Sequence, residues 1–301
     1  MKNLKYFFLI FCSFSIGQNV TVNSGATITV GSGKYISIAG NFSNSGTTTL
    51  NSSSNSYSAL LVSGSSSGNI TYNRYVNTVG SGEWDLVGSP VGSQSISGFV
   101  SSNSGSVATS GSTYAIGTYS NASGGGWSNY TTSSGSNDVA SAGNFPVGTG
   151  YQMASASGGI LAFTGTVATS DQTVDITDNS GSGGTKWNLV ANPFPSYLNG
   201  NSNAGTNNFF STNSGVLHGS FQAIYGYDYD SGGSNYTPYN ATSTWFIAPG
   251  QAFFVASANA SGSSVAFNEN MQNASPSSYD DFVANTVQDE VEIGLYNGDS
   301  R

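Results

Sequence analysis

Two short acidic patterns place pairs of carboxylates where they could do chemistry. Asp228 and Asp230 are two positions apart and so share one face of a predicted strand, and Glu83 and Asp85 have the same spacing. A glycosidase needs such a pair, with one carboxyl group held protonated and the other ionised. Acids on an exposed strand face are usually solvated, and no hydrolase motif surrounds these. The sequence therefore predicts no enzyme.

Residues 228–233, Asp-Tyr-Asp-Ser-Gly-Gly, also resemble the start of a calcium-binding loop. Hard cations prefer carboxylate oxygens at alternate positions around a glycine-assisted bend, which makes Asp228 and Asp230 candidate calcium ligands. The third acidic ligand and the distal glutamate of such a loop are missing, and a plain turn after a strand explains the same residues. Calcium is the one cofactor that the sequence suggests.

His218 is the only histidine of the chain, so a Ser-His-Asp triad would have to include it. No nucleophile-elbow pattern and no partner at a recognisable spacing accompany it. A single histidine in a loop is more often a surface or structural residue, and His218 is interpreted in that way.

Aromatic residues gather in the middle of two segments of the chain. Exposed tryptophan and tyrosine rings can stack on sugar rings, because they combine a flat apolar face with a polar group. The candidate carbohydrate-binding residues are Trp127, Tyr130, Tyr236 and Tyr239. The alternative is that these side chains form cross-strand pairs that stabilise a sheet.

Composition and charge narrow the possible partners. The chain has 15 acidic and 6 basic residues, a net charge of −9, so it lacks the clustered Lys and Arg that a nucleic-acid partner requires. Lys2 and Lys5 precede a short apolar run, and small residues follow it before Gln18, which predicts a signal peptide over residues 1–17. The expected mature chain has no cysteine and no membrane span, and its predicted location is secreted or on the outer cell surface.

The chain contains an internal duplication. Residues 84–90, Trp-Asp-Leu-Val-Gly-Ser-Pro, return as residues 187–193, Trp-Asn-Leu-Val-Ala-Asn-Pro, and similar glycine turns and aromatic strands follow each motif in the same order. The shared residues are types that build cores and turns, so the duplication concerns architecture. Each Trp-(Asp/Asn)-Leu-Val strand is expected to bury its tryptophan and its valine.

Abundant Gly, Ser, Thr and Asn, many aromatic residues and few charges predict an all-β fold. Short N-terminal strands form either a β-solenoid or a meander, followed by two duplicated β-sandwich-like units, and no amphipathic helix is expected. The expected segments are a signal peptide (1–17), a short-strand region (18–77), a first unit (78–178), a second unit (179–275), and an acidic linker with the start of a further, truncated β segment (276–301).

Several motifs resemble those of large secreted proteins of Bacteroidetes, chiefly flavobacteria, that leave the cell by the type IX secretion route. The resemblance rests on four segments: residues 39–47, residues 73–76 with 84–90, residues 187–196 and residues 247–255. It covers nearly all of the expected mature chain. Similar proteins usually finish with a β-sandwich sorting domain that the secretion machinery recognises, and this sequence departs from that pattern by stopping at Arg301.

These observations favour a non-catalytic adhesin or scaffold protein that contacts extracellular polysaccharide or another cell surface, with the type IX machinery as a partner of the full-length chain. The alternative is a carbohydrate-binding or spacer region of a larger secreted enzyme truncated at Arg301.

Overall fold

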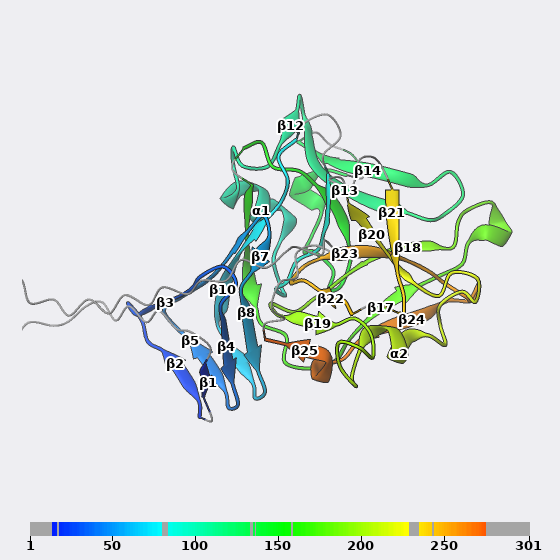
Figure 1. Cartoon of the computed structure of the whole chain (residues 1–301). Coiled ribbons are helices and arrows are strands. Elements are labelled where there is room, and N and C mark those ends of the chain that lie inside the picture. The colour runs from blue at the N-terminus through cyan, green and yellow to red at the C-terminus, as the bar shows by residue number, and fades with distance from the viewer. Residues whose placement is uncertain are drawn as a thin grey trace, which may run out of the picture.

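The computed structural model describes residues 14–16, 18–79, 84–132, 135, 137–157, 159–228, 235–242 and 244–274. It is an all-β protein in which two short helices accompany many strands. Figure 1 shows the N-terminal strands stacked at one side of the molecule and the later strands in a larger body beside them.

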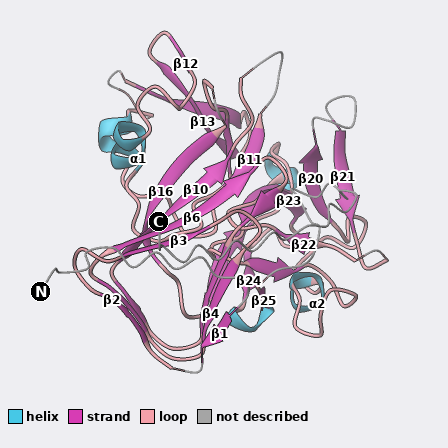
Figure 2. Ribbon diagram, turned by 60° about the vertical axis from the view of Figure 1, so that its left-hand side comes forward, coloured by secondary structure: helices cyan, strands magenta, loops and turns pink. Residues whose placement is uncertain are grey.

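The N-terminal strands form a parallel β-solenoid. Ile36 pairs with Leu60 in one sheet, Val20 with Phe42 in a second, and Thr29 with Thr49 in a third, always in parallel. Each coil of the chain therefore contributes one strand to each of three sheets, which confirms the solenoid and excludes the meander. The first sheet contains β1 (Phe14–Ile16), β4 (Tyr35–Ile38) and β8 (Ala59–Val62), and the second contains β2 (Val20–Val22), β5 (Phe42–Asn44) and β9 (Ser66–Ser67). The third contains β3 (Thr27–Val30), β6 (Thr47–Ser53) and β10 (Asn69–Tyr75), and β7 (Ser56–Tyr57) pairs with β6. Figure 2 shows the strands of the solenoid along its three sides.

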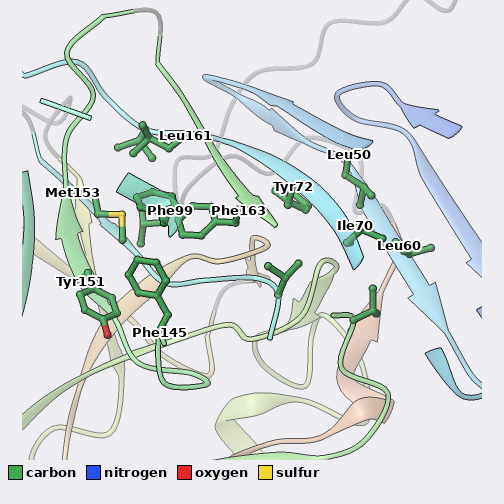
Figure 3. Close-up of a cluster of buried hydrophobic side chains, with 14 of the residues drawn as sticks. Leu50, Leu60, Ile70, Tyr72, Phe99, Phe145, Tyr151, Met153, Leu161 and Phe163 are labelled. Atoms are coloured by element: carbon green, nitrogen blue, oxygen red, sulfur yellow. The ribbon is translucent and has the colours of Figure 1, made fainter. Parts of the chain in front are cut away.

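The core of the solenoid continues into the first duplicated unit. Alternate residues of the solenoid strands point inward, among them Leu50 and Ile70, because successive side chains of a strand face opposite sides of its sheet. They belong to the same buried cluster as Phe99 and Phe163 of the first unit, and Figure 3 shows the two groups side by side. The packing therefore has no break at the expected segment boundary near residue 78.

The two duplicated units share one topology. In each, the Trp-x-Leu-Val strand pairs with a later aromatic strand, which pairs in turn with a hairpin, and a separate antiparallel pair closes the unit. The first unit contains β11 (Asp85–Val87), α1 (Ile96–Ser102), β12 (Thr109–Ser110), β13 (Thr113–Ser120), β14 (Gly126–Thr131), β15 (Tyr151–Met153) and β16 (Ile160–Thr166), which pairs with β10. The second contains β17 (Gln172–Ile176), which pairs with β24 and precedes the expected start of this unit at residue 179. It also contains β18 (Trp187–Ala191), α2 (Phe209–Asn213), β20 (Ile224–Asp228), β21 (Asn235–Tyr239), β23 (Ala252–Ala256) and β24 (Ser263–Phe267).

The helices α1 and α2 correct the expectation that the chain has no amphipathic helix. Each occupies the same place in its unit and is capped by a polar side chain, with Ser95 accepting from Gly98 N–H and Asn208 accepting from Ser211 N–H. Both helices are too short for a clear helical period, which is why the sequence pattern missed them. A small sheet of β19 (Tyr197–Asn199), β22 (Phe246–Ile247) and β25 (Gln272–Asn273) completes the second unit.

The two units pack around an approximate internal twofold axis. Gly88 N–H donates to Gly250 O at 2.8 Å, and Ala191 N–H donates to Gly148 O at 2.7 Å. Ala191 is the counterpart of Gly88 in the duplicated motif, and Gly250 is the counterpart of Gly148 in the later glycine turn. Such reciprocal contacts are the signature of a twofold interface, so the two copies form one body.

The solenoid packs against the second unit through a buried arginine. Arg74 of β10 is fully buried, its guanidinium lies 4.0 Å from the ring centre of Tyr57, and its Nε donates to Pro249 O at 2.9 Å. Leu60 N–H also donates to Pro195 O at 2.7 Å, in the turn after β18. Within the described residues, no helix is long and apolar enough to cross a membrane.

Candidate functional site

The structure brings Trp127 and Tyr236 together in an aromatic pocket. These are two of the large hydrophobic side chains left exposed, at 38% and 42% of their surface. The pocket has a volume of about 340 Å³, at the small end of the range for ligand sites. Its described lining residues are all aromatic: Tyr119, Trp127, Trp187, Phe221, Tyr225, Tyr236 and Phe254. We call this set the aromatic pocket.

Two hairpins, one from each unit, form one part of the aromatic pocket. Tyr119 faces Trp127 across β13 and β14, and Tyr227 faces Tyr236 across β20 and β21. Three of these four rings contact Phe254 of β23. The ring centre of Phe254 lies 4.8 Å from that of Tyr119, 6.0 Å from that of Trp127 and 5.3 Å from that of Tyr236, all edge-to-face. The rings are therefore held in place by the strand register and by one another.

The rest of the aromatic pocket comes from the second unit. Trp187 on β18 packs edge-to-face against Tyr225 on β20 at 4.7 Å and against Phe221 at 5.2 Å. The sequence pattern predicted that Trp187 would be buried, but the side chain is only half-buried. Trp187 and Val190 lie on opposite faces of β18, so that Trp187 lines the pocket while Val190 packs in the core.

The structure does not bring the other two aromatic candidates into this pocket. Tyr130 is half-buried and packs 6.5 Å from Tyr151, next to the core of the first unit. Tyr239 packs 6.3 Å from Trp245, next to the core of the second unit. Both rings support the sheets in the manner of cross-strand and core aromatics.

Comparison of the two copies shows which residues create the pocket. The pair Tyr225 and Phe254 of the second copy has Gly117 and Gln152 as its counterpart, because both pairs lie opposite each other on matching strands. In the first copy, Gln152 Nε2 instead donates to Asn129 Oδ1 at 3.1 Å, and this polar contact occupies the corresponding place. The duplication preserved the scaffold and a cross-strand aromatic pair, Tyr119 with Trp127 in the first copy and Tyr227 with Tyr236 in the second. Only the second copy adds aromatic residues at the positions of Gly117 and Gln152.

Sequence reasoning found two of the seven lining residues. The other five were not predicted to contact a ligand, because they come from separate strands and loops, and because Trp187 was assigned to the core. A position-by-position alignment of the two copies contains a usable signal. Tyr225 and Phe254 stand where the first copy has Gly117 and Gln152, so the shared scaffold does not require these two rings.

None of the described lining residues carries a charge at neutral pH. Burial raises the pKa of Tyr236 above its usual value, and the nearby phenols of Tyr227 and Tyr119 raise it further. Burial likewise raises the pKa of Tyr225. These phenols therefore stay neutral, and can donate hydrogen bonds, throughout the physiological pH range.

His218 is not among the described lining residues of the aromatic pocket. Lys186 Nζ is 3.0 Å from His218 Nε2 and 4.0 Å from Asp178 Oδ2, and the His218 ring centre is 5.3 Å from that of Phe221. An ammonium group can only donate, so Nε2 accepts from Lys186. The cluster contacts the lining residue Phe221, since Lys186 Nζ also lies 5.7 Å from the centre of the Phe221 ring.

The acidic candidates occupy different positions. The side chain of Asp228 and all of Asp230 lie outside the described residues, so the calcium site stays a prediction. Asp85 accepts hydrogen bonds from the backbone N–H and the side-chain amide of Asn77, at 2.7 and 2.8 Å. These bonds tie the first residue of β11 to the segment after β10. In the described part of the chain, no group of three or more His, Cys, Asp or Glu side chains could hold a metal ion.

Comparison with known proteins adds one relationship. The sequence model of a protein family described as a domain of unknown function (DUF8693) matches residues 13–294. No curated protein and no solved structure matches the chain.

Proposed function

The chain belongs to the DUF8693 family, and we propose that it is a non-catalytic exported protein, an adhesin or scaffold of the cell surface, that binds polysaccharide in the aromatic pocket. The observation that carries this proposal is the convergence of seven aromatic side chains from both duplicated units on one accessible pocket. Sugar rings have apolar C–H faces that stack on such side chains.

The general composition supports the same proposal. Few charges and abundant Ser, Thr and Asn suit hydrated contact with polysaccharide or with another cell surface. The expected signal peptide, together with the resemblance to type IX cargo, supports secretion or display on the outer surface. We include the type IX machinery as a partner of the full-length protein.

Retention on immobilised polysaccharides tests the proposal. The full chain is applied to a panel of bacterial, algal and plant polysaccharides, next to the double variant Trp127→Ala/Tyr236→Ala. Tyr130→Phe serves as the aromatic control outside the pocket. We expect retention of the parent and of Tyr130→Phe on at least one polymer and loss of retention for the double variant. Equal retention of all three proteins would reject the pocket as the binding site.

The same pocket is compatible with a second role, as a binding or spacer region of a larger secreted enzyme. Retention on a single polysaccharide favours that role, because an accessory module holds one substrate near a catalytic domain. Retention on several unrelated polymers and cell surfaces favours the adhesin.

A further inference from the structure

We infer that the aromatic pocket selects an uncharged saccharide ring, held at the junction of the two duplicated units. This inference rests on the proposed function and specifies its ligand class. Three features carry it: the charge of the lining, the placement of the tyrosine hydroxyl groups, and the contribution of both units to one site.

The lining disfavours a charged ligand. The described side chains around the pocket are aromatic and neutral. Burial of a carboxylate or sulfate against them without a partner is unfavourable, because the ion loses its hydration. The nearest described cation, Lys186, is already held by His218 and Asp178. The net charge of −9 also repels anionic polymers at long range.

Hydroxyl groups at the pocket favour a sugar over an apolar peptide. Tyr119 Oη lies 3.2 Å from Thr185 Oγ1, and the phenols of Tyr119 and Tyr227 lie near enough to Tyr236 to influence its pKa. A sugar ring presents apolar C–H groups and hydroxyls together, so one ring can stack on Trp127 and exchange hydrogen bonds with these phenols. An apolar peptide side chain would leave the phenols without that exchange.

The ligand is expected to contact both units. Tyr119 and Trp127 come from the first unit, whereas Tyr225, Tyr236 and Phe254 come from the second. Because these rings meet across the internal twofold axis, a bound ring stabilises the packing of one unit against the other. Binding should therefore raise the melting temperature of the whole protein.

The test compares one polymer in two charge states. Neutral glucan, mannan and galactan are titrated into the full chain by calorimetry, and the best binder is compared with the same polymer after oxidation of its C6 hydroxyls to carboxylates. The variants are Trp127→Ala, which removes a stacking face, and Lys34→Gln, which removes a cation of the solenoid that is not part of the pocket lining. We expect the oxidised polymer to bind at least about tenfold more weakly, Trp127→Ala to abolish binding, and Lys34→Gln to have no effect on it.

Two contrary results are distinguishable. Binding of the oxidised polymer as tightly as the neutral one, with loss in Trp127→Ala, would overturn the inference of an uncharged ligand and leave polysaccharide binding in place. Failure of every polymer to bind, or occupation of the pocket only by an apolar peptide or a hydrophobic dye that no polymer displaces, would overturn both.

Discussion

Asn103 and Asn213 make the same three hydrogen bonds in the two copies of the duplicated unit. Each side-chain amide donates to the carbonyl four residues earlier in its own helix and to the carbonyl of one residue of the closing strand, Ala162 or Ala266. Each side-chain oxygen accepts from the N–H of that same strand residue at 2.7 Å. Both side chains are buried, so each asparagine fastens a short helix to a strand.

Replacement of either asparagine is expected to destabilise the protein. Asn103→Ala or Asn213→Ala removes three hydrogen bonds, two of them to a part-buried N–H and carbonyl of the closing strand, and should lower the free energy of unfolding by about 2–3 kcal/mol. Urea unfolding measures the effect. The exposed Asn203→Ala is the control and should change stability by less than about 0.5 kcal/mol; equal losses in all three variants would contradict a specific role.

Arg74 is expected to be essential for docking the solenoid on the second unit. Arg74→Met keeps much of the volume but removes the hydrogen bond to Pro249 O and the contact with the Tyr57 ring, so stability should fall by about 2–4 kcal/mol. Arg74→Lys should also lower the free energy of unfolding, because one ammonium group cannot reproduce the contacts of the planar guanidinium group. Lys34→Met, which removes a partly exposed cation of the solenoid, is the control. Unchanged unfolding of Arg74→Met would refute the docking role.

The internal twofold axis can be tested at Gly88. A Cβ atom at this position would lie 2.3 Å from Ala191 Cβ and 2.7 Å from Thr149 O. Gly88→Ala should therefore cost about 1–3 kcal/mol. Adding Ala191→Gly removes one of the two clashes and should restore part of that loss in a double-mutant cycle. Strictly additive effects would show that the two residues do not face each other.

High pH should act on the aromatic pocket through its tyrosines. The pKa values of Tyr225 and Tyr236 are raised above 10.0 in the folded protein, so the unfolded chain loses these protons first as the pH increases. Their contribution to stability is complete below pH 10 and falls above it. Ultraviolet titration should show late-ionising tyrosines, one fewer in Tyr236→Phe. A titration in which every tyrosine ionises together near 10.0 would rule this out.

Much of the architecture was predictable from the sequence. The alternating segments before residue 77 predicted strands, and the repeated Trp-x-Leu-Val motif identified the duplication. Pattern alone could not separate solenoid from meander, because the choice depends on which strands pair, and pairing is non-local. The helices escaped notice because α2 spans only residues 209–213.

The site was less predictable than the fold. Trp127 and Tyr236 were identifiable as aromatic residues on polar hairpins. Phe254, in contrast, lies in a strand whose five residues are all buried, and sequence patterns assign an aromatic residue in such a strand to the core. Its role in the pocket depends on the approach of Tyr119 from the other unit, which no local pattern encodes.

Oxidation of Trp127 tests the central claim most directly. N-Bromosuccinimide attacks accessible indoles, so Trp127, which is 38% exposed, should react before Trp245, which is 2% exposed. Mass spectrometry of the digested protein then measures oxidation at each site with and without a retained polysaccharide. If the ligand occupies the aromatic pocket, it protects Trp127 and leaves the slow reaction of Trp245 unchanged. Equal oxidation of Trp127 with and without saturating polysaccharide would contradict the account.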